Sequence, residues 1–214
     1  MAPPSERSTV RRIPERGAYD TDVIYQVLDE ALVCHIAFST DQGPVAVPTI
    51  HARVGNVLYL HGSHASRMMR TTVDTDVCVA ATIVDGIVAA RSAFHHSLNY
   101  RSVVVFGRPR VVIDPQERML AFEAITNHVL PGRWDEARPP NEKEDAATRL
   151  IALEITEASA KVRTGPPGDD EEDMGLGIWA GVIPLAVTPG TPEPAPDLEP
   201  GVELPPSVRS YGKE

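Results

Sequence analysis

One short segment places a glycine, a hydroxyl group and an arginine where a strand ends and a helix can begin. Residues 58–60 have a strand pattern, His61 and Gly62 follow, and Ser66 and Arg67 come next. A glycine lets a ligand approach the backbone, and free N–H groups at a helix start attract an anion beside Arg67. The segment indicates a phosphate-monoester site, with an ordinary strand–turn–helix and a surface arginine as the alternative.

A second segment brings polar groups to the entry of an apolar strand. Residues 94–107 contain Arg101 and Ser102, which point to opposite faces because side chains alternate along a strand. One of them therefore faces the interior or a groove between subunits, where it can hydrogen-bond the polar edge of a ring. In a third segment Trp179 is flanked by glycines, and its ring either stacks on a ligand or fills the core.

The seven histidines and two cysteines form no metal-ligand motif. His61 is the strongest functional candidate among the histidines because it lies in the first segment, whereas a structural role is the general expectation. Cys34 and Cys78 lie in apolar stretches, so we expect two buried thiols, with a disulfide as the alternative. The chain has no nucleophile-elbow motif, which argues against a hydrolase.

The hydrophobic pattern predicts short strands and two amphipathic helices. One helix starts near Thr21, capped by Asp20 or Thr21, and another is capped by Asp114 with Pro115 at its first position. Strands are expected at residues 32–39, 45–54, 57–61, 77–84, 101–113 (bent at 107) and 150–157, with a short helix at 64–73. Such strands, separated by turns, favour a small β-barrel or sandwich with peripheral helices.

The two ends of the chain depart from this pattern. Residues 1–17 are rich in Pro, Arg and Ser and are expected to form an arm. Eight prolines between Pro184 and Pro206 exclude a regular helix or a central strand. Residues 186–214 are therefore either a disordered tail or an arm that wraps a partner subunit, and residues 18–185 form the expected domain.

Charge and hydropathy exclude two classes of partner. A formal net charge of −10 repels DNA and anionic lipid. The longest uncharged apolar run, residues 77–84, is too short to span a bilayer, and residues 1–12 lack the apolar region of a signal peptide. We expect a cytoplasmic protein without a nucleic-acid or membrane partner.

Taken together, the three segments resemble the pyridoxamine 5′-phosphate oxidase-like flavin-binding split-barrel superfamily over roughly residues 14–185. The chain looks most like the branch of flavin-nucleotide-binding proteins that includes the nitroimidazole-resistance (Nim) proteins. Arg67 stands at the arginine of the oxidases' phosphate motif, and Met68 replaces the lysine that follows it. Arg101-Ser102-Val103 matches their Arg-Gln-Val, Ile178-Trp179-Ala180-Gly181 matches their Phe-Trp-x-Gly, and residues 45–50, with Thr49, match a ring-contacting stretch.

The resemblance implies a mainly β fold, a six-stranded antiparallel split β-barrel with peripheral helices, that forms a homodimer with the flavin at its interface. It implies an FMN-dependent oxidoreductase acting on a small organic substrate, with His61 as the candidate catalytic residue. The expected cofactor-binding residues are Thr49, His61, Gly62, Ser66, Arg67, Arg101, Ser102 and Trp179, with no metal.

Two departures from the oxidases change the expected activity. Their Arg-Leu-His-Asp-Arg run, which binds pyridoxal phosphate, is replaced by Ile183-Pro184-Leu185, so we do not expect pyridoxamine phosphate oxidation. Without this lysine, Arg67 is expected to bind the phosphate together with Arg70 or Arg101. The absence of the lysine also makes the deazaflavin F420 an alternative cofactor. The alternatives are a non-catalytic flavin-binding or storage protein, an F420-dependent reductase and a haem-binding split barrel.

Overall fold

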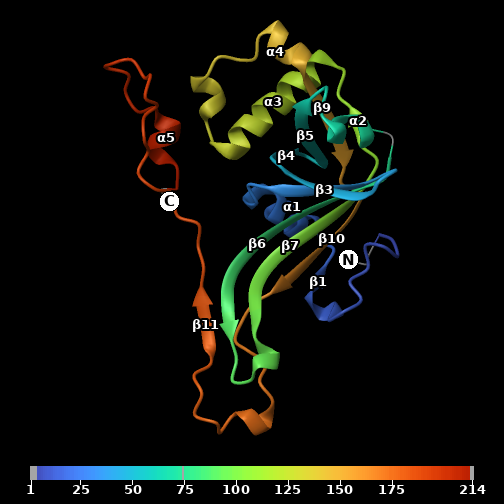
Figure 1. The fold of residues 1–214 in the computed structure, drawn as a ribbon, viewed down its shortest axis with the longest axis vertical. Helices are drawn as coiled ribbons and strands as arrows, with labels where there is room; N and C mark the ends of the chain where they lie inside the picture. Colours follow the sequence, from blue (N-terminus) through green and yellow to red (C-terminus); the bar gives the residue numbers. More distant parts are fainter. Residues whose placement is uncertain (1–3, 74, 213–214) are drawn as a thin grey trace.

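In the computed structural model, which describes residues 4–73 and 75–212, two antiparallel sheets make up most of the fold (Figure 1). The larger sheet consists of β1 (Gly17–Ala18), β2 (Cys34–Thr40), β3 (Gly43–Thr49), β6 (Val77–Ala89), β7 (Ser97–Gly107), β10 (Glu157–Arg163) and β11 (Gly181–Pro184). The smaller sheet consists of β4 (His51–Val54), β5 (Val57–Ser63), β8 (Arg110–Val111) and β9 (Thr148–Glu154). The predicted mainly β, antiparallel split-barrel fold is confirmed, and the strands β1, β10 and β11 add to those that the pattern indicates.

The main core lies between the two sheets and under helix α1 (Thr21–Glu30). The strands β2, β5, β6, β7, β9 and β10 contribute alternating apolar side chains to it, because every second residue of a strand points to the same face. Helix α1 buries Ile24, Val27 and Leu28 on one face. It begins after Asp20, as its sequence predicts.

Helix α3 (Pro115–Val129) covers the other face of the smaller sheet and forms a second core with it. The carboxylate of Asp114 accepts a hydrogen bond from the Glu117 backbone N–H at 2.9 Å, which satisfies a free donor of the first turn. The predicted cap of this helix is confirmed. The remaining helical segments are α2 (Arg67–Thr71), α4 (Glu142–Ala147), α5 (Pro206–Ser210), η1 (Pro14–Arg16), η2 (Ala93–His95), η3 (Arg133–Glu136) and η4 (Glu171–Asp173).

Strands β6 and β7 run beyond the barrel and form, with β11, an extension on the side away from α2, α3 and α4 (Figure 1). The expectation that the strand ends near Asp85 is wrong, because β6 continues to Ala89 after a register shift between Val84 and Gly86. A Cβ on Gly86 would lie 3.0 Å from the Ile183 carbonyl oxygen. Glycine therefore marks the bulge and the close approach of β11, rather than a turn.

Two predicted strands are each divided between the sheets. Residues 45–54 form β3 and β4, which lie in different sheets on either side of Ile50. The predicted strand at 101–113 ends at Gly107, and β8 pairs with β9 instead. Both predictions of a single strand are therefore wrong. Alternation along a sequence does not reveal where a chain passes from one sheet to the next.

The C-terminal arm leaves β11 and returns toward the end of α3 (Figure 1). There the backbone N–H of Ser207 donates to Glu136 Oε1 at 3.0 Å, and its hydroxyl donates to the same carboxylate. Of the described helices, none combines the length and apolar character that a membrane crossing needs. Cys34 and Cys78 are free thiols, and burial raises the pKa of Cys34 to about 12.

Candidate functional site

The segment from the end of β5 to the start of α2 presents two arginines without partners. Arg67 and Arg70 are both exposed on α2. Within residues 4–73 and 75–212, neither guanidinium makes a hydrogen bond or an ion pair. Helix α2 has only five residues, so the positive charge available to an anion comes from these side chains rather than from a helix dipole.

His61 adds a polar atom without a partner to the same segment. It lies on β5 opposite Leu150 of β9, and its Nδ1 is buried without a hydrogen bond. Burial lowers the pKa of His61, which keeps the ring neutral at pH 7. A neutral imidazole offers one donor and one acceptor, so the orphaned nitrogen fits a hydrogen bond to a ligand.

The other residues near this segment that are predicted to bind the cofactor are Gly62, Ser66 and Thr49. A Cβ on Gly62 would lie 3.0 Å from Met69 Cγ, so the glycine lets α2 pack closely on β5. Ser66 precedes α2 without a capping side-chain bond, which leaves its hydroxyl available. Thr49 ends β3, and its hydroxyl donates to the Ile50 carbonyl at 3.3 Å. The cofactor roles of these residues remain predictions.

Arg101 lies in a different place and is fully engaged by carboxylates. Its Nε and Nη2 donate to the two oxygens of Asp85 at 3.0 and 2.8 Å, and its Nη1 donates to Glu30. These two carboxylates raise the pKa of Arg101 above its usual value. Of the two possible partners of Arg67, Arg70 is therefore the one with an unoccupied guanidinium.

Arg101 closes the polar end of a cavity at an interrupted sheet edge, which we call the edge cavity. Strand β6 pairs with β2 as far as Ala81 and with β11 from Gly86 onward, so the stretch between them lacks a strand on that side. The resulting cavity has a volume of about 800 Å³. Its apolar walls include Leu32, Val33, Ile83, Val84, Leu185 and Val187, and its polar end is formed by Glu30, Asp85 and Arg101. Its size is in the range of cofactor pockets.

Ser102 and Trp179 lie apart from both of these places. Ser102 points to the opposite face of β7 from Arg101, and its hydroxyl donates to the Lys161 carbonyl at 3.3 Å. Trp179 precedes β11, is 66% exposed, and packs its ring over Gly181. In Figure 1, α2 and β11 lie at opposite ends of the molecule. One chain therefore does not bring the predicted cofactor-binding residues into a single site.

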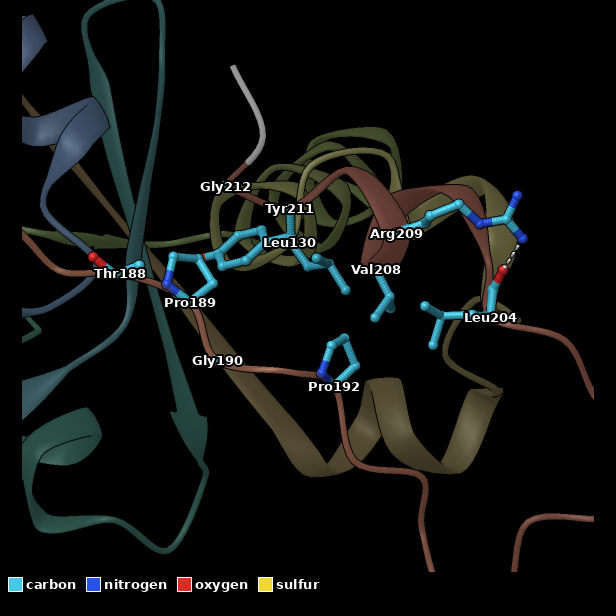
Figure 2. A pocket seen from close by; sticks show the side chains of 10 residues that line it. All are labelled: Leu130, Thr188, Pro189, Gly190, Pro192, Leu204, Val208, Arg209, Tyr211 and Gly212. Atoms are coloured by element: carbon cyan, nitrogen blue, oxygen red, sulfur yellow. Dashed lines mark hydrogen bonds between the residues drawn. The ribbon is translucent and has the colours of Figure 1, made fainter.

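A second pocket lies between the C-terminal arm and the end of α3 (Figure 2). Its volume is about 430 Å³, and Leu130, Pro189, Leu204, Val208 and Tyr211 contribute to its lining. Arg209 donates from Nη2 to the Leu204 carbonyl at 2.8 Å. The lining residues include no His, Asp, Glu or Cys, so the pocket lacks an acid–base pair. Its existence is not predicted from the sequence, because the proline-rich arm has no periodic pattern.

Metal ligands do not gather in the part of the chain that the structure describes. No group of three His, Cys, Asp or Glu side chains there has an arrangement that could hold a metal ion. The histidines instead make isolated contacts: His51 Nε2 donates to the Leu28 carbonyl at 2.8 Å, and His95 Nε2 contacts Asp170 at 3.0 Å. A ligand site in this chain therefore depends on the arginines and the single histidines.

Two solved structures are similar to this chain over nearly its whole length. The flavocytochrome Anf3 from Azotobacter vinelandii is 36% identical, with 97% of both chains covered and a TM-score of 0.92. The FAD and haem binding protein from Mycobacterium smegmatis is 38% identical, with 92% of this chain and 97% of that chain covered and a TM-score of 0.88.

A 5-nitroimidazole antibiotic resistance protein from Bacteroides thetaiotaomicron shares the fold at 16% identity. The match covers 68% of this chain and 86% of that chain with a TM-score of 0.56. No curated protein matches the sequence. The family model described as pyridoxamine 5′-phosphate oxidase matches residues 20–162, which is more than half of the chain. The chain therefore belongs to the pyridoxamine 5′-phosphate oxidase family.

Proposed function

We propose that this chain is a flavoprotein that also binds haem and transfers electrons between a small organic substrate and these two groups. One observation carries the proposal: the likeness to a flavocytochrome extends over 97% of both chains. A match over 97% of the chain includes the β6–β7–β11 extension and the C-terminal arm. The second full-length relative is named for FAD and haem binding, which supports the same pair of cofactors.

For the flavin, the residues of the β5–α2 segment fit a phosphate and a polar ring. Arg67 and Arg70 offer unpaired guanidinium groups, which bind phosphate oxygens through paired N–H donors. The buried, unpartnered Nδ1 of His61 offers a hydrogen bond to a ligand at the same end of β5. The sequence resemblance implies FMN and the Mycobacterium smegmatis relative is named for FAD; both have the phosphate next to the ribityl chain that Arg67 would bind.

For haem, we propose His96 as the iron ligand. Its Nδ1 contacts the Ser92 carbonyl at 2.9 Å, which leaves Nε2 outward and available. Histidines that bind metals commonly donate their other ring nitrogen to a carbonyl in this way. The nearby extension supplies exposed apolar side chains, including Phe94 and Leu98, as a haem requires. Bound flavin would exchange two electrons with a substrate, whereas haem would exchange one at a time.

The first test is the visible spectrum of the protein purified without added cofactor, followed by mass spectrometry of what heat releases. We expect flavin bands together with a Soret band, and the released mass distinguishes FMN from FAD and from F420. His96→Ala should abolish the Soret band and leave the flavin bands, with His64→Ala, an exposed histidine elsewhere, as the matched control. A protein that carries neither a flavin nor haem, even after both are added, would contradict the proposal.

A flavin-dependent oxidoreductase without haem is the second candidate, and the unpaired Arg67 and the orphaned Nδ1 of His61 favour it. Flavin bands without a Soret band, also after haem is added, would support this candidate. The redox assay then uses NAD(P)H, reduced F420 and a nitroaromatic acceptor. A yellow protein that cycles with none of them would favour flavin storage instead.

A further inference from the structure

Arg163, the last residue of β10, is a buried arginine without an acidic partner. The residue is 7% exposed. Its Nη1 donates to Asn99 Oδ1 and, at 3.3 Å, to the Gly165 carbonyl, and its Nη2 donates to the Pro166 carbonyl at 3.1 Å. Its Nε is buried without a hydrogen-bond partner. Neutral oxygens therefore account for every contact of this guanidinium with the described residues.

The acidic residues near Arg163 or Arg16 in the sequence are engaged elsewhere or exposed, and Glu157 of the same strand pairs with Arg7 at 2.6 Å. Asp169 accepts from Arg91 Nη1 at 2.7 Å, and Asp170 contacts His95. Glu15 is exposed and forms no ion pair among residues 4–73 and 75–212. A buried charge is costly unless an opposite charge compensates it, and no carboxylate of residues 4–73 and 75–212 compensates that of Arg163.

A second arginine increases this excess of positive charge. Burial lowers the pKa of Arg163, and the charge of nearby Arg16 lowers it further. The guanidinium of Arg16 has no hydrogen bond or ion pair with any described residue. Lys161 lies on the same face of β10 two residues earlier, and its Nζ donates to the Arg12 carbonyl at 2.9 Å. Cations thus gather here in a chain of net charge −10.

We propose that Arg16 and Arg163 bind the phosphate or diphosphate group of a small-molecule ligand, at a place we call the β10 anion site. Two guanidinium groups with Lys161 beside them match an anion of multiple charge better than a single carboxylate, and guanidinium binds phosphate oxygens in pairs. Tyr100 and Ser102 lie on the same face, because they pair with Arg163 and Lys161 across β7 and β10. A ligand held there would therefore also lie along the predicted cofactor residue Ser102.

The phosphate could belong to a dinucleotide flavin or to a separate phosphorylated substrate. Calorimetric titration of the full chain with inorganic pyrophosphate tests the site in protein without flavin, saturated with FMN and saturated with FAD. We expect binding to the flavin-free protein and also to the FMN-saturated protein, in which the phosphate proposed for Arg67 is already bound. Loss of binding only in the FAD-saturated protein would assign the site to the second phosphate of FAD. Binding in all three states would assign it to a separate phosphorylated molecule.

Variants separate this site from the flavin segment. Arg16→Gln should weaken pyrophosphate binding about tenfold or more, because a charge-assisted hydrogen bond is lost. Arg11→Gln, an exposed arginine paired with Glu6, is the matched control and should bind as the wild type does. Arg67 and Arg70 would also attract free pyrophosphate under the proposed function, so Arg16→Gln and Arg11→Gln are compared in the FMN-saturated protein, where the flavin phosphate occupies that segment.

Arg163→Gln also loses its hydrogen bonds to the carbonyls of residues 165 and 166, which could lower the stability of the fold. Its thermal unfolding is therefore measured before its binding, and Arg16→Gln is the primary variant. The proposal is overturned if FMN-saturated wild-type protein does not bind pyrophosphate, or if Arg16→Gln in that state binds it as tightly as Arg11→Gln does. It is also overturned if Arg163→Gln leaves pyrophosphate binding unchanged but alters the sedimentation coefficient, since a second subunit would then supply the counter-charge. None of these outcomes affects the flavin or Soret spectrum on which the proposed function depends.

Discussion

Two histidines hold the C-terminal end of α1 in place. His51 Nε2 donates to the Leu28 carbonyl at 2.8 Å, and His128 Nε2 donates to the Ala31 carbonyl at 3.0 Å. Their rings lie 4.8 Å apart and satisfy carbonyls that the end of a helix leaves free. Because Glu30 and Ala31 line the edge cavity, these histidines position its wall. They support the expectation that most histidines of this chain have structural roles.

His51 should make the protein less stable as the pH falls from about 6.5 toward 4. Burial lowers its pKa to about 4, so in this range the unfolded chain binds a proton that the folded chain does not. The wild type should lose on the order of 2–3 kcal/mol of unfolding free energy through this group. Urea unfolding at pH 7.5 and 4.5 tests this, and His51→Gln should show a smaller difference. An equal difference in His51→Gln and in the exposed control His64→Gln would contradict it.

Arg67→Ala should weaken flavin binding by about 1.5–3 kcal/mol, because a charge-assisted hydrogen bond to the phosphate is lost. Arg67 has no other partner among the described residues, so the substitution breaks no contact in the unliganded fold. Fluorescence titration of flavin-free protein measures the affinity, with Arg11→Ala as the control. An unchanged affinity would show that the phosphate binds elsewhere.

The residue types in the candidate sites are visible in the sequence, but their partners are not. A local strand–turn–helix exposes Arg67, as both the phosphate-site interpretation and its surface-arginine alternative expect, so its role stays a prediction. Arg101 instead contacts Glu30, 71 residues earlier, and Asp85, 16 residues earlier. The sequence pattern does not single out Arg163. What distinguishes it is that its side chain is buried without a carboxylate partner among the described residues. Long-range pairing and burial depend on the assembled sheets.

At the scale of elements, local chemistry decides which boundaries are predictable. Helix α3 begins where Asp114, Pro115 and Glu117 place it, because a cap depends on residues within one turn. The division of residues 45–54 between β3 and β4 depends on where two sheets separate. Strand β10 carries Ala158 and Ala160 at its buried positions, which are weak strand formers. Its pairing with β7 is what makes it a strand.

Asp114→Ala should lower the free energy of unfolding by about 0.5–2 kcal/mol, because the Glu117 N–H loses its capping acceptor. Glu117 also accepts from Tyr59 and pairs with Arg110, so a loosened first turn disturbs the contact between α3 and the smaller sheet. Urea unfolding measures the change. Gln116→Ala, an exposed position in the same turn, is the control and should change little. Equal stability of both variants would show that the cap contributes nothing.

At the scale of the molecule, the extension exposes an apolar stripe that the chain itself does not cover. Ile183 of β11, Ile87 of β6 and Leu98 of β7 lie side by side in register, and all point to the same face. They are 48%, 40% and 43% exposed. A contiguous apolar stripe on a projecting sheet is typical of an interface between subunits. It is consistent with the predicted homodimer, which stays a prediction.

If the predicted homodimer forms through this stripe, Leu98→Asp should make the protein monomeric, because an aspartate in the middle of the stripe places a charge in an apolar contact. The flavin should be lost with it, since neither chain alone unites the predicted cofactor-binding residues. Sedimentation velocity and the flavin absorbance of the purified variant measure both effects. Ile113→Asp, at a position that is 82% exposed outside the extension, is the matched control and should remain dimeric and yellow. A Leu98→Asp variant that stays dimeric would place the interface elsewhere, whereas a monomer that keeps its flavin would show that one chain completes the site.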